Sequence, residues 1–253
     1  MSDAPRIERV RHELRRRRLT VLRVERIAPI LTRVVLGGAE LEGFTSLGFD
    51  DHVKLVFPAR DGGEPTMRDF TPRRYDAAKG ELVIDFFVHE SGPAAEWSRE
   101  VKAGDALTVA GPKGSAVIAP EGIGTHVLIG DETAVPALAR RLEELPDGAS
   151  VVVFVESDTA SPWLELPRAE QANVHWIARE SRGEAPATAL MDALRRFGEL
   201  PPRAFFWIAA ESRTARALRK HLREERGIDL AWIKASGYWQ RGAVGAHESI
   251  IDA

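Results

Sequence analysis

The stretch His126-Val127-Leu128-Ile129-Gly130-Asp131-Glu132-Thr133 decides the fold class of the second half of the chain. Its first part is a short apolar run, and a helical segment, 133–145, follows it. Next comes 151–156, a continuous β-branched run of the kind that forms a strand buried on both faces of a sheet. Further strands at 174–178, 205–210 and 230–234 alternate with helices at 187–197 and 213–226. Strands that alternate with helices predict a parallel α/β sheet.

Residues before about 120 follow a different pattern, that of short strands separated by turns. Turn sequences occur at Arg60-Asp61-Gly62-Gly63 and Ala78-Lys79-Gly80. The expected strands are 20–27, 31–36, 53–57, 82–88 and 106–110, and the one expected helix is 93–101. Several short strands at this spacing predict an antiparallel sandwich or barrel. We therefore expect a barrel followed by a nucleotide-type sheet.

The length of 253 residues favours two domains of ordinary size. Hydrophobic residues make up 44% of the chain and charged residues 29%, a composition typical of globular proteins. There is no cysteine, which excludes disulfides, a catalytic thiol and cysteine ligation of zinc or iron–sulfur clusters. No long apolar run is present, so we expect a cytoplasmic protein without membrane insertion.

A dense basic run, Arg15-Arg16-Arg17-Arg18, lies near the N-terminus. Such a run is typical of an arm that binds nucleic acid or an anionic membrane. Two observations favour a solvated leader instead: Glu8, Glu13 and Glu25 interleave with the arginines, and the chain has a net charge of −3. We therefore expect a basic leader over residues 1–18 and no nucleic-acid partner.

The most informative cluster is Arg68-Asp69-Phe70-Thr71-Pro72-Arg73, which places two guanidinium groups, a hydroxyl and an aromatic ring close together in the chain. In an extended segment, Arg68, Phe70 and Pro72 would face one way and the other three residues the opposite way. A flat cofactor with a diphosphate tail needs this mixture of ring contact, hydrogen bond and arginine. A charged strand edge is an equally good interpretation of these residues alone.

The second cluster, His89-Glu90-Ser91-Gly92-Pro93-Ala94-Ala95-Glu96-Trp97, is typical of a helix start. Ser91 is a candidate N-cap, and Pro93 suits an early helical position because it has no N–H to leave unpaired. Gly92 would let an anion approach closely, so the helix start is a candidate phosphate site. The alternative is a capped helix that binds nothing.

Together with three later motifs, these clusters resemble the siderophore-interacting protein family, FAD-dependent ferric-siderophore reductases of the ferredoxin-reductase-like superfamily. The later motifs are Gly111-Pro112-Lys113-Gly114-Ser115, Asp131-Glu132-Thr133-Ala134-Val135-Pro136-Ala137 and Ser236-Gly237-Tyr238-Trp239-Gln240-Arg241-Gly242. The resemblance extends from about Arg18 to Gly242. It implies an N-terminal antiparallel six-stranded flavin-binding β-barrel at 19–120 and a C-terminal parallel α/β nucleotide-binding sheet at 125–236. A tail, 237–253, would lie near the flavin.

The resemblance implies FAD as a cofactor and assigns its contacts residue by residue. Phe70 would pack along the flavin ring, and Thr71 would hydrogen-bond its reactive edge. Arg68 and Arg73 would engage the diphosphate or ribityl side. His89 and the helix start, Gly92, Pro93, Ala94 and Ala95, would complete the site. The family usually has tyrosine at the position of Phe70, so a phenolic hydrogen bond is lost while the stacking face is retained.

The second cofactor implied is NADPH or NADH. The residues expected to bind it lie at strand-to-helix transitions and beside them: Asp131, Glu132, Thr133, Ala134, Arg179, Glu211, Ser212 and Arg213. There is no GxGxxG, which argues against a dehydrogenase-type dinucleotide fold, but flavin reductases of this superfamily do not use that fingerprint. Glu156 and Asp158 would suit a ribose hydroxyl. Arg179, Arg182 and Arg213 would neutralise a 2′-phosphate, so the choice stays open.

A ferric siderophore is the implied substrate, and an anionic chelate requires cationic groups beside the flavin. Lys54 and Arg241 match the family's basic cluster, and Trp239 would sit near the flavin or the nicotinamide. A solvent-facing strand lysine and a core or interface tryptophan are the alternatives for Lys54 and Trp239. Gln240 stands where relatives often carry a basic residue, so one charge is missing there.

The implied activity is hydride transfer from NAD(P)H to flavin and then one-electron reduction of the Fe(III)-siderophore to release Fe(II), with no protein-bound metal. One alternative is a flavoprotein that exchanges electrons with ferredoxin or another redox protein, for which a basic docking surface would be needed. The other is a siderophore-binding or regulatory protein that keeps the fold without turnover.

Overall fold

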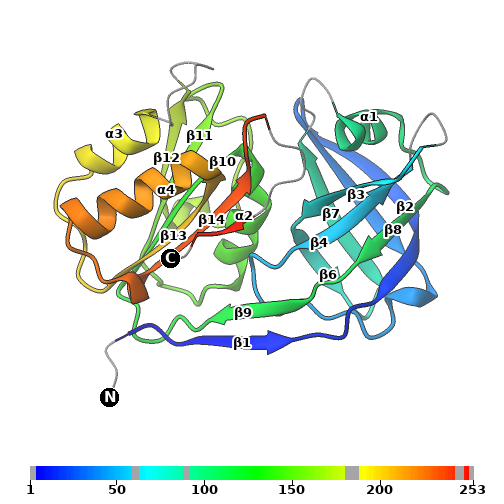
Figure 1. Cartoon of the computed structure of the whole chain (residues 1–253), viewed down its shortest axis with the longest axis horizontal. Coiled ribbons are helices and arrows are strands. Elements are labelled where there is room, and N and C mark those ends of the chain that lie inside the picture. Colours follow the sequence, from blue (N-terminus) through cyan, green and yellow to red (C-terminus); the bar gives the residue numbers. More distant parts are fainter. Residues whose placement is uncertain (1–3, 59–62, 88–91, 180–187, 243–247, 251–253) are drawn as a thin grey trace. The chain divides into compact units, whose positions relative to one another are not determined.

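The computed structural model describes residues 4–58, 63–87, 92–179, 188–242 and 248–250. The chain divides into two compact units (Figure 1). One is Ile7–Ile118, and the other is Ala119–Ala253 with Met1–Arg6. His89, Ser91 and Arg182, which the sequence analysis singled out, lie outside the described residues.

Seven of the described strands in Ile7–Ile118 form one curled antiparallel sheet, in the order β5-β4-β8-β2-β3-β7-β6 (Figure 1). They are β2 (Arg16–Ala28), β3 (Leu31–Gly37), β4 (Val53–Phe57), β5 (Thr66–Phe70), β6 (Pro72–Asp76), β7 (Glu81–Phe87) and β8 (Ala106–Ala110). The two edge strands, β5 and β6, follow each other in the chain and are connected by Thr71 alone. Because one residue joins both edges, the sheet closes on itself as a barrel.

This is the barrel that the sequence predicts, with one strand more than the six expected. As one extended segment, 68–73 would alternate between two faces, whereas the chain forms two strands there. Thr71, Pro72 and Arg73 are all buried, which breaks the alternation expected of one strand. The break lies where the chain passes from one edge of the sheet to the other.

The barrel core comes from the inward-facing residues of its strands. On β4, Val53, Leu55 and Phe57 are buried, while the residues between them are partly exposed. Helix α1 (Pro93–Glu100) packs Trp97 against Phe57, with 5.7 Å between the ring centroids. Full burial of a phenylalanine side chain contributes about 1.5–3 kcal/mol to the free energy of unfolding. The core therefore supplies much of the stability of this unit.

The expected leader over residues 1–18 is wrong. Residues Ile7–Arg11 form β1, which pairs antiparallel with β9 (Gly114–Ile118), and β2 already begins at Arg16. The arginine run follows strand alternation, since Arg17 is buried while its two neighbours in the run are exposed. The Arg17 guanidinium lies 5.4 Å from the Phe44 ring centroid, a cation–π contact that stabilises the buried charge.

Six described strands of the other unit form a second sheet, in the order β12-β11-β10-β13-β14-β15. They are β10 (Thr125–Asp131), β11 (Val151–Ser157), β12 (Asn173–Ala178), β13 (Ala204–Glu211), β14 (Ile233–Trp239) and β15 (Glu248–Ser249). All neighbours pair in parallel except β15, which is antiparallel to β14. Helices α3 (Thr188–Arg196) and α4 (Ser212–Lys220) cover one face of this sheet, and α2 (Val135–Glu144) covers the other (Figure 1).

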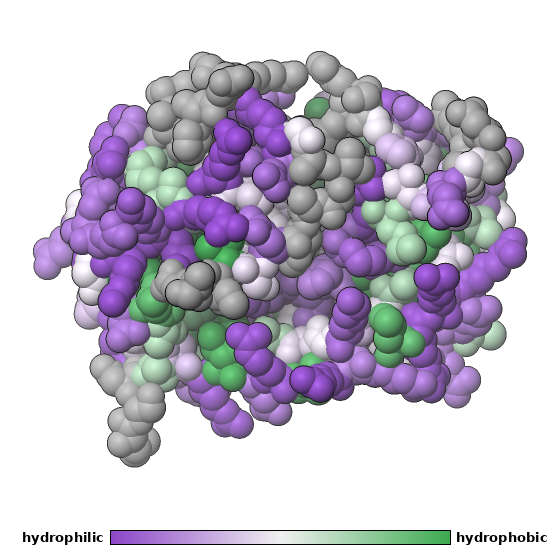
Figure 2. Space-filling model, in the orientation of Figure 1, coloured by the Kyte–Doolittle hydropathy of each residue, from purple (hydrophilic) through white to green (hydrophobic). Residues whose placement is uncertain are grey.

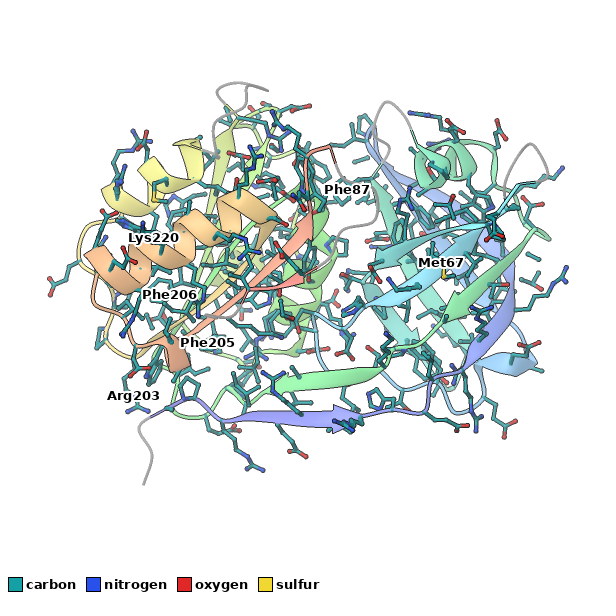
Figure 3. All side chains as sticks on the ribbon, in the orientation of Figure 1. Met67, Phe87, Arg203, Phe205, Phe206 and Lys220 are labelled. Carbon is teal, nitrogen blue, oxygen red and sulfur yellow. The ribbon has the colours of Figure 1, made fainter. Side chains whose placement is uncertain are left out.

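The central strands of this sheet are buried on both faces, as their continuous apolar runs predict. The adjacent Phe205 and Phe206 on β13 (Figure 3) point to opposite faces, and both are fully buried. Leu190 of α3 and Leu218 of α4 belong to the core on the Phe206 side. The α/β arrangement follows from this two-sided burial.

Two helix boundaries and one strand boundary differ from the sequence expectation. The helix expected from 133 begins as a 3₁₀ turn, η2 (Glu132–Ala134), before α2, and α4 continues into a π-helical turn at His221–Glu225. The last parallel strand is preceded by a 3₁₀ turn, Leu230–Trp232, and runs to Trp239. The expected tail, 237–253, therefore begins inside β14. A Cβ at Gly237 would collide with Ser212, so the glycine there marks close packing of α4 on the strand.

Hydrophobic residues on the face shown in Figure 2 form small, separate patches among hydrophilic ones. Large exposed hydrophobic side chains, such as Leu14 and Met67, occur in Ile7–Ile118. Isolated apolar side chains of this kind are normal on protein surfaces. Among the described residues, no helix is long and apolar enough to cross a membrane.

Candidate functional sites in the two units

The α/β sheet has a topological switch point between β10 and β13. From β10 the chain adds β11 and β12 on one side, and it then returns to add β13 and β14 on the other side. Ligands of open α/β sheets bind outside the carboxyl ends of the strands at such a point. Asp131 ends β10 and Glu211 ends β13, so two of the predicted nucleotide residues flank the switch point.

Asp131 is the centre of a hydrogen-bond network at this point. Its Oδ1 accepts from the backbone N–H of Thr133 at 2.9 Å and from the Thr133 hydroxyl at 2.5 Å. Its Oδ2 accepts from the backbone N–H of Glu211 at 3.1 Å and from Trp239 Nε1 at 2.8 Å. The side chain is only 2% exposed, and four donors compensate its buried charge. Asp131 therefore ties the ends of β10, β13 and β14 together.

Close backbone packing explains why a glycine precedes Asp131. A Cβ at Gly130 would lie 2.5 Å from the Cβ of Ala134 and 2.8 Å from the carbonyl oxygen of Ala209. No larger residue fits between η2 and β13 without a shift of backbone. Asp131 then caps η2, since its side chain accepts from the N–H of Thr133.

Glu211 caps α4, the second helix start predicted to face the nucleotide. Its Oε2 accepts from the N–H groups of Arg213 at 2.7 Å and Thr214 at 3.1 Å. The Ser212 hydroxyl donates to the Trp239 carbonyl oxygen at 3.2 Å and is buried. Arg213 is exposed at the first turn of the helix. A carboxylate thus already occupies the N-terminus of α4, and Arg213 is the predicted residue left facing solvent.

Arg179 lies just beyond β12 and pairs with carboxylates from three segments. Its guanidinium contacts Glu132, Glu156 at 3.3 Å and Asp158 at 3.1 Å. With all three acids ionised, this cluster carries a net charge of −2. In the sequence, Glu156 and Asp158 suit a ribose hydroxyl and Arg179 suits a 2′-phosphate, whereas the structure pairs the arginine with both acids.

Burial makes two acids of this cluster, Glu132 and Glu156, weaker than usual. Burial, and then the charge of Asp131, raise the pKa of Glu132 to about 7 despite the Arg179 contact. Burial also raises the pKa of Glu156, one of whose oxygens has no hydrogen-bond partner among the described residues. Burial lowers the pKa of Arg179, but Glu132 and Glu156 outweigh this effect and raise it above its usual value. The guanidinium therefore stays charged while Glu132 changes ionisation near neutral pH.

The barrel cluster 68–73 lies where the sheet closes. Phe70 is half-buried, with its ring centroid 4.6 Å from that of Phe86 and 6.2 Å from that of Phe57. Thr71 is buried at the crossing between β5 and β6. Arg68 Nη1 donates to the Met67 carbonyl oxygen at 2.8 Å. The cluster thus combines an aromatic face and a hydroxyl on a rigid part of the barrel.

Arg73 points to the β6–β7 side of this closure. Its Nε lies 4.0 Å from Oδ2 of Asp85, a buried residue of β7. Asp85 also forms a two-pronged pair with Arg33, at 2.7 and 2.8 Å. Two arginines therefore share one buried carboxylate at this side of the barrel.

Lys54, the predicted substrate contact, is paired with Asp69. The two residues face each other across β4 and β5, and Lys54 Nζ lies 2.9 Å from both carboxylate oxygens. Lys54 is 40% exposed and Asp69 11% exposed in their side chains. The sequence predicts no role for Asp69, because the register between these strands is not visible in the chain.

Helix α1 starts as the second cluster predicts, at Pro93. Its N-cap is Gly92, which has a φ of +117° and makes no side-chain capping bond. No described atom lies within 4 Å of the place where a Cβ on Gly92 would be. Ala94 is half-buried and Ala95 buried against the barrel. As far as the described residues extend, the helix start is therefore open on the Gly92 side.

Of the remaining predicted residues, Ala134 is fully buried in η2, and Arg241 is exposed, with its N–H directed at Glu211 Oε1 at 3.4 Å. Trp239 is partly exposed while its indole N–H is held by Asp131. Within the part of the chain that the structure describes, no cluster of histidine, aspartate and glutamate is arranged to hold a metal ion. The roles assigned to these residues stay predictions.

The two units match two family models in chain order. Residues 20–66 and 59–116 match a siderophore-interacting FAD-binding domain, and residues 123–242 match the model of the siderophore-interacting protein family. An NADPH-dependent ferric-chelate reductase of Escherichia coli is 38% identical, over 94% of this chain and 99% of that protein. A ferric vibriobactin reductase of Vibrio cholerae is 30% identical, over 89% and 90%.

Solved structures show the same fold. A siderophore utilization protein from T. fusca is 37% identical and superposes with a TM-score of 0.86, over 95% of this chain and 98% of that one. A ferredoxin NADP⁺ reductase from Neisseria gonorrhoeae, at 13% identity and a TM-score of 0.53, shares the fold over 82% and 90%. The predicted fold class, a β-barrel followed by an α/β sheet of ferredoxin-reductase-like type, is confirmed.

Proposed function

This chain belongs to the siderophore-interacting protein family, and we propose that it is an FAD-dependent ferric-siderophore reductase that uses NADPH. The observation that carries the proposal is the similarity, over 94% of the chain, to an NADPH-dependent ferric-chelate reductase. Each compact unit matches one family model, so the matches include both the barrel and the α/β sheet.

The barrel residues fit FAD. Phe70 offers an aromatic face that Phe57 and Phe86 support from within the barrel, and such a face suits a flat ring. The start of α1 offers backbone N–H groups behind a glycine whose Cβ position is open, which suits a phosphate. Arg68 and Arg73 supply cationic groups for the diphosphate. We propose that these residues, with Thr71, hold the flavin.

When bound, FAD accepts a hydride and passes the two electrons on singly. In the overall reaction, NADPH and two Fe(III) chelates give NADP⁺, one proton and two Fe(II) chelates. Iron release follows because Fe(II) binds hard oxygen ligands less tightly than Fe(III). The chain's own residues bind and orient: Thr71 presents a hydroxyl on a rigid crossing of the barrel, and Trp239 is held in one orientation by Asp131.

The carboxyl ends of β10, β13 and β14 are the proposed NADPH site. Thr133 and the 3₁₀ turn after Asp131 provide polar groups at the switch point. We assign the 2′-phosphate to Arg213 rather than to Arg179. Arg213 is exposed, whereas three carboxylates surround Arg179 and would repel a phosphate.

Lys54 and Arg241 are the proposed contacts for the ferric siderophore. Asp69 compensates the charge of Lys54, so Lys54 attracts an anionic chelate less than a free lysine would. This moderate attraction favours capture and release of the chelate over tight retention. We place the reaction in the cytoplasm, since the proposed reductant, NADPH, is supplied there.

The test is to purify the chain, load it with FAD and follow the flavin absorbance without oxygen. NADPH should bleach the flavin band, and a ferric siderophore should restore it while a ferrous chelator traps two Fe(II) per NADPH. In a parallel experiment, reduced ferredoxin replaces NADPH. If ferredoxin bleaches the flavin faster than NADPH does, ferredoxin is an electron donor. Failure of the chain to bind FAD, or to reduce the chelate once loaded, would overturn the proposal.

A further inference from the structure

A basic pocket in the barrel unit has no role in the proposed reaction. It has a volume of about 260 Å³ and lies where the link between β1 and β2 meets Gly43, Thr45 and the Gly111-Pro112 segment after β8. Arg11, His12, Arg15 and Arg17 line it, and Glu13 is the one acid in its wall. All these residues belong to Ile7–Ile118, so the pocket is built within one compact unit.

Arg17 is the innermost cation of this pocket. It is 4% exposed, and its Nη1 and Nη2 make only long bonds, both 3.4 Å, to the carbonyl oxygens of Gly111 and Gly43. Its Nε has no hydrogen-bond partner among the described residues, and the guanidinium lies 5.4 Å from the Phe44 ring centroid. A buried guanidinium needs an anionic partner to offset the cost of leaving water. The fold therefore presents an incompletely satisfied arginine to the pocket.

The residues that line the pocket carry an excess of positive charge. Arg11, Arg15 and Arg17 contribute three positive charges, and Glu13 contributes one negative charge, so the lining has a net charge of +2 before His12 is considered. Glu40 and Glu42, outside the lining, also attract Arg17 and Arg15. Glu13 is held by Arg15 at 2.7 Å. Burial, and then the charge of Arg15, lower the pKa of Arg17 below the usual guanidinium value. A bound dianion would balance the charge of the lining residues.

The wall beside His12 is fixed by a hydrogen-bond chain. Ser115 Oγ donates to Asp51 Oδ2 at 2.6 Å and accepts from the Leu47 N–H at 3.0 Å. Its single proton is used in the bond to the carboxylate, so His12 Nε2, at 2.7 Å, must be the donor in the remaining contact. The imidazole is thus held in one tautomer and one orientation at the pocket.

We propose that this pocket binds a doubly charged oxyanion of the phosphate class, held by Arg17 from within and by Arg11 and Arg15 at its mouth. Guanidinium groups match such oxyanions because their N–H groups form paired bonds to neighbouring oxygens. Inorganic phosphate and the phosphate group of a small metabolite share this chemistry. The volume leaves room for more than a bare phosphate, since a water molecule occupies about 30 Å³ in the liquid.

The experiment is calorimetric titration of inorganic phosphate into the full chain loaded with FAD and saturated with NADP⁺. These cofactors occupy the other proposed phosphate contacts. We expect saturable binding, weakened at least fivefold in Arg11→Gln and in Arg15→Gln. Arg16→Gln is the matched control, because Arg16 carries the same charge on the opposite, exposed face of β2. It should change the affinity less than twofold.

A second titration with glycerol 1-phosphate separates the two sources of the anion. Tighter binding than that of inorganic phosphate assigns the pocket to a phosphorylated metabolite, and equal binding assigns it to free phosphate. Absence of saturable binding, or an equal loss in Arg16→Gln, would overturn the proposal. NADPH-driven ferric-chelate reduction in the same variants should stay at the unsubstituted level, so failure of this site and failure of the reductase assignment are distinguishable.

Discussion

Trp239 Nε1 donates a hydrogen bond of 2.8 Å to Oδ2 of Asp131, a residue 108 positions earlier in the chain. The same carboxylate accepts from the backbone N–H of Glu211 and from Thr133. One buried aspartate therefore orients the indole and fixes the ends of three strands. Orientation of Trp239 and local stability should depend on the same bond.

Replacement of Trp239 by phenylalanine removes the indole donor and keeps a ring of similar character. We expect a loss of about 1–2 kcal/mol in the free energy of unfolding, because a hydrogen bond to a charged, buried acceptor is lost. Urea denaturation measures the change. Trp232→Phe is the control, since Trp232 contacts Arg203 and not Asp131. Equal losses in both variants would show that the Asp131 bond contributes nothing specific.

The pair formed by Lys54 and Asp69 predicts opposite effects of two substitutions on chelate binding. Lys54→Ala leaves Asp69 to repel an anionic siderophore, so we expect the apparent KM for the chelate to rise about fivefold with flavin content unchanged. Asp69→Asn frees the lysine charge and should lower the same KM. Steady-state kinetics with flavin quantified in each variant test this. Loss of flavin in Lys54→Ala would show that the assignment is wrong.

The fold was largely predictable because its signals are local. Apolar alternation around Leu55 and the continuous run around Phe154 are visible in any window of the sequence. The crossing at Thr71 was not predictable, because a residue that links two sheet edges has the same neighbours as one inside a strand. The pairing of β1 with β9 was not predictable either, since nothing near Ile7 indicates a pairing with Ile118.

The candidate site residues were likewise predictable only in part: their identity was predictable and their partners were not. Sequence reasoning identified Asp131, Arg179 and Lys54 individually, by their residue types at strand ends and on a strand. It missed the partners that determine their charge, such as Asp69, because strand register and loop contacts join distant segments. Pairing changes the chemistry, since a compensated lysine and a free lysine attract an anion differently.

Phe70 is predicted to hold the flavin through its aromatic face. Phe70→Leu retains much of the apolar volume in the cluster with Phe57 and Phe86 but loses the ring, so we expect the Kd for FAD to rise about tenfold. Phe70→Tyr should bind FAD at least as tightly. Fluorescence titration of the apoprotein gives both values. Phe44→Leu changes a ring packed on Tyr75 and serves as the control; a similar rise there would argue for a general loss of packing.

Arg213 is predicted to discriminate between the two nucleotides. Arg213→Ala should raise the KM for NADPH about tenfold and leave the KM for NADH unchanged, because only NADPH carries a 2′-phosphate. Arg216→Ala is the control, since Arg216 is exposed on the same helix but pairs with Glu248. A change in the KM of both nucleotides, or none in either, would assign the 2′-phosphate to another residue.

His126 should make the stability of the α/β unit depend on pH. Burial, and then the charge of Arg141, lower the pKa of His126 from 6.5 to about 3. Between these values the unfolded chain binds a proton at His126 that the folded chain does not, so His126 costs no stability above pH 6.5 and costs increasingly more as the pH drops toward 3. By pH 4 the loss from this residue is about 3 kcal/mol. Urea denaturation at pH 7.5 and pH 4 should show a smaller loss for His126→Gln than for the unsubstituted chain, and an equal loss in both would contradict the assignment.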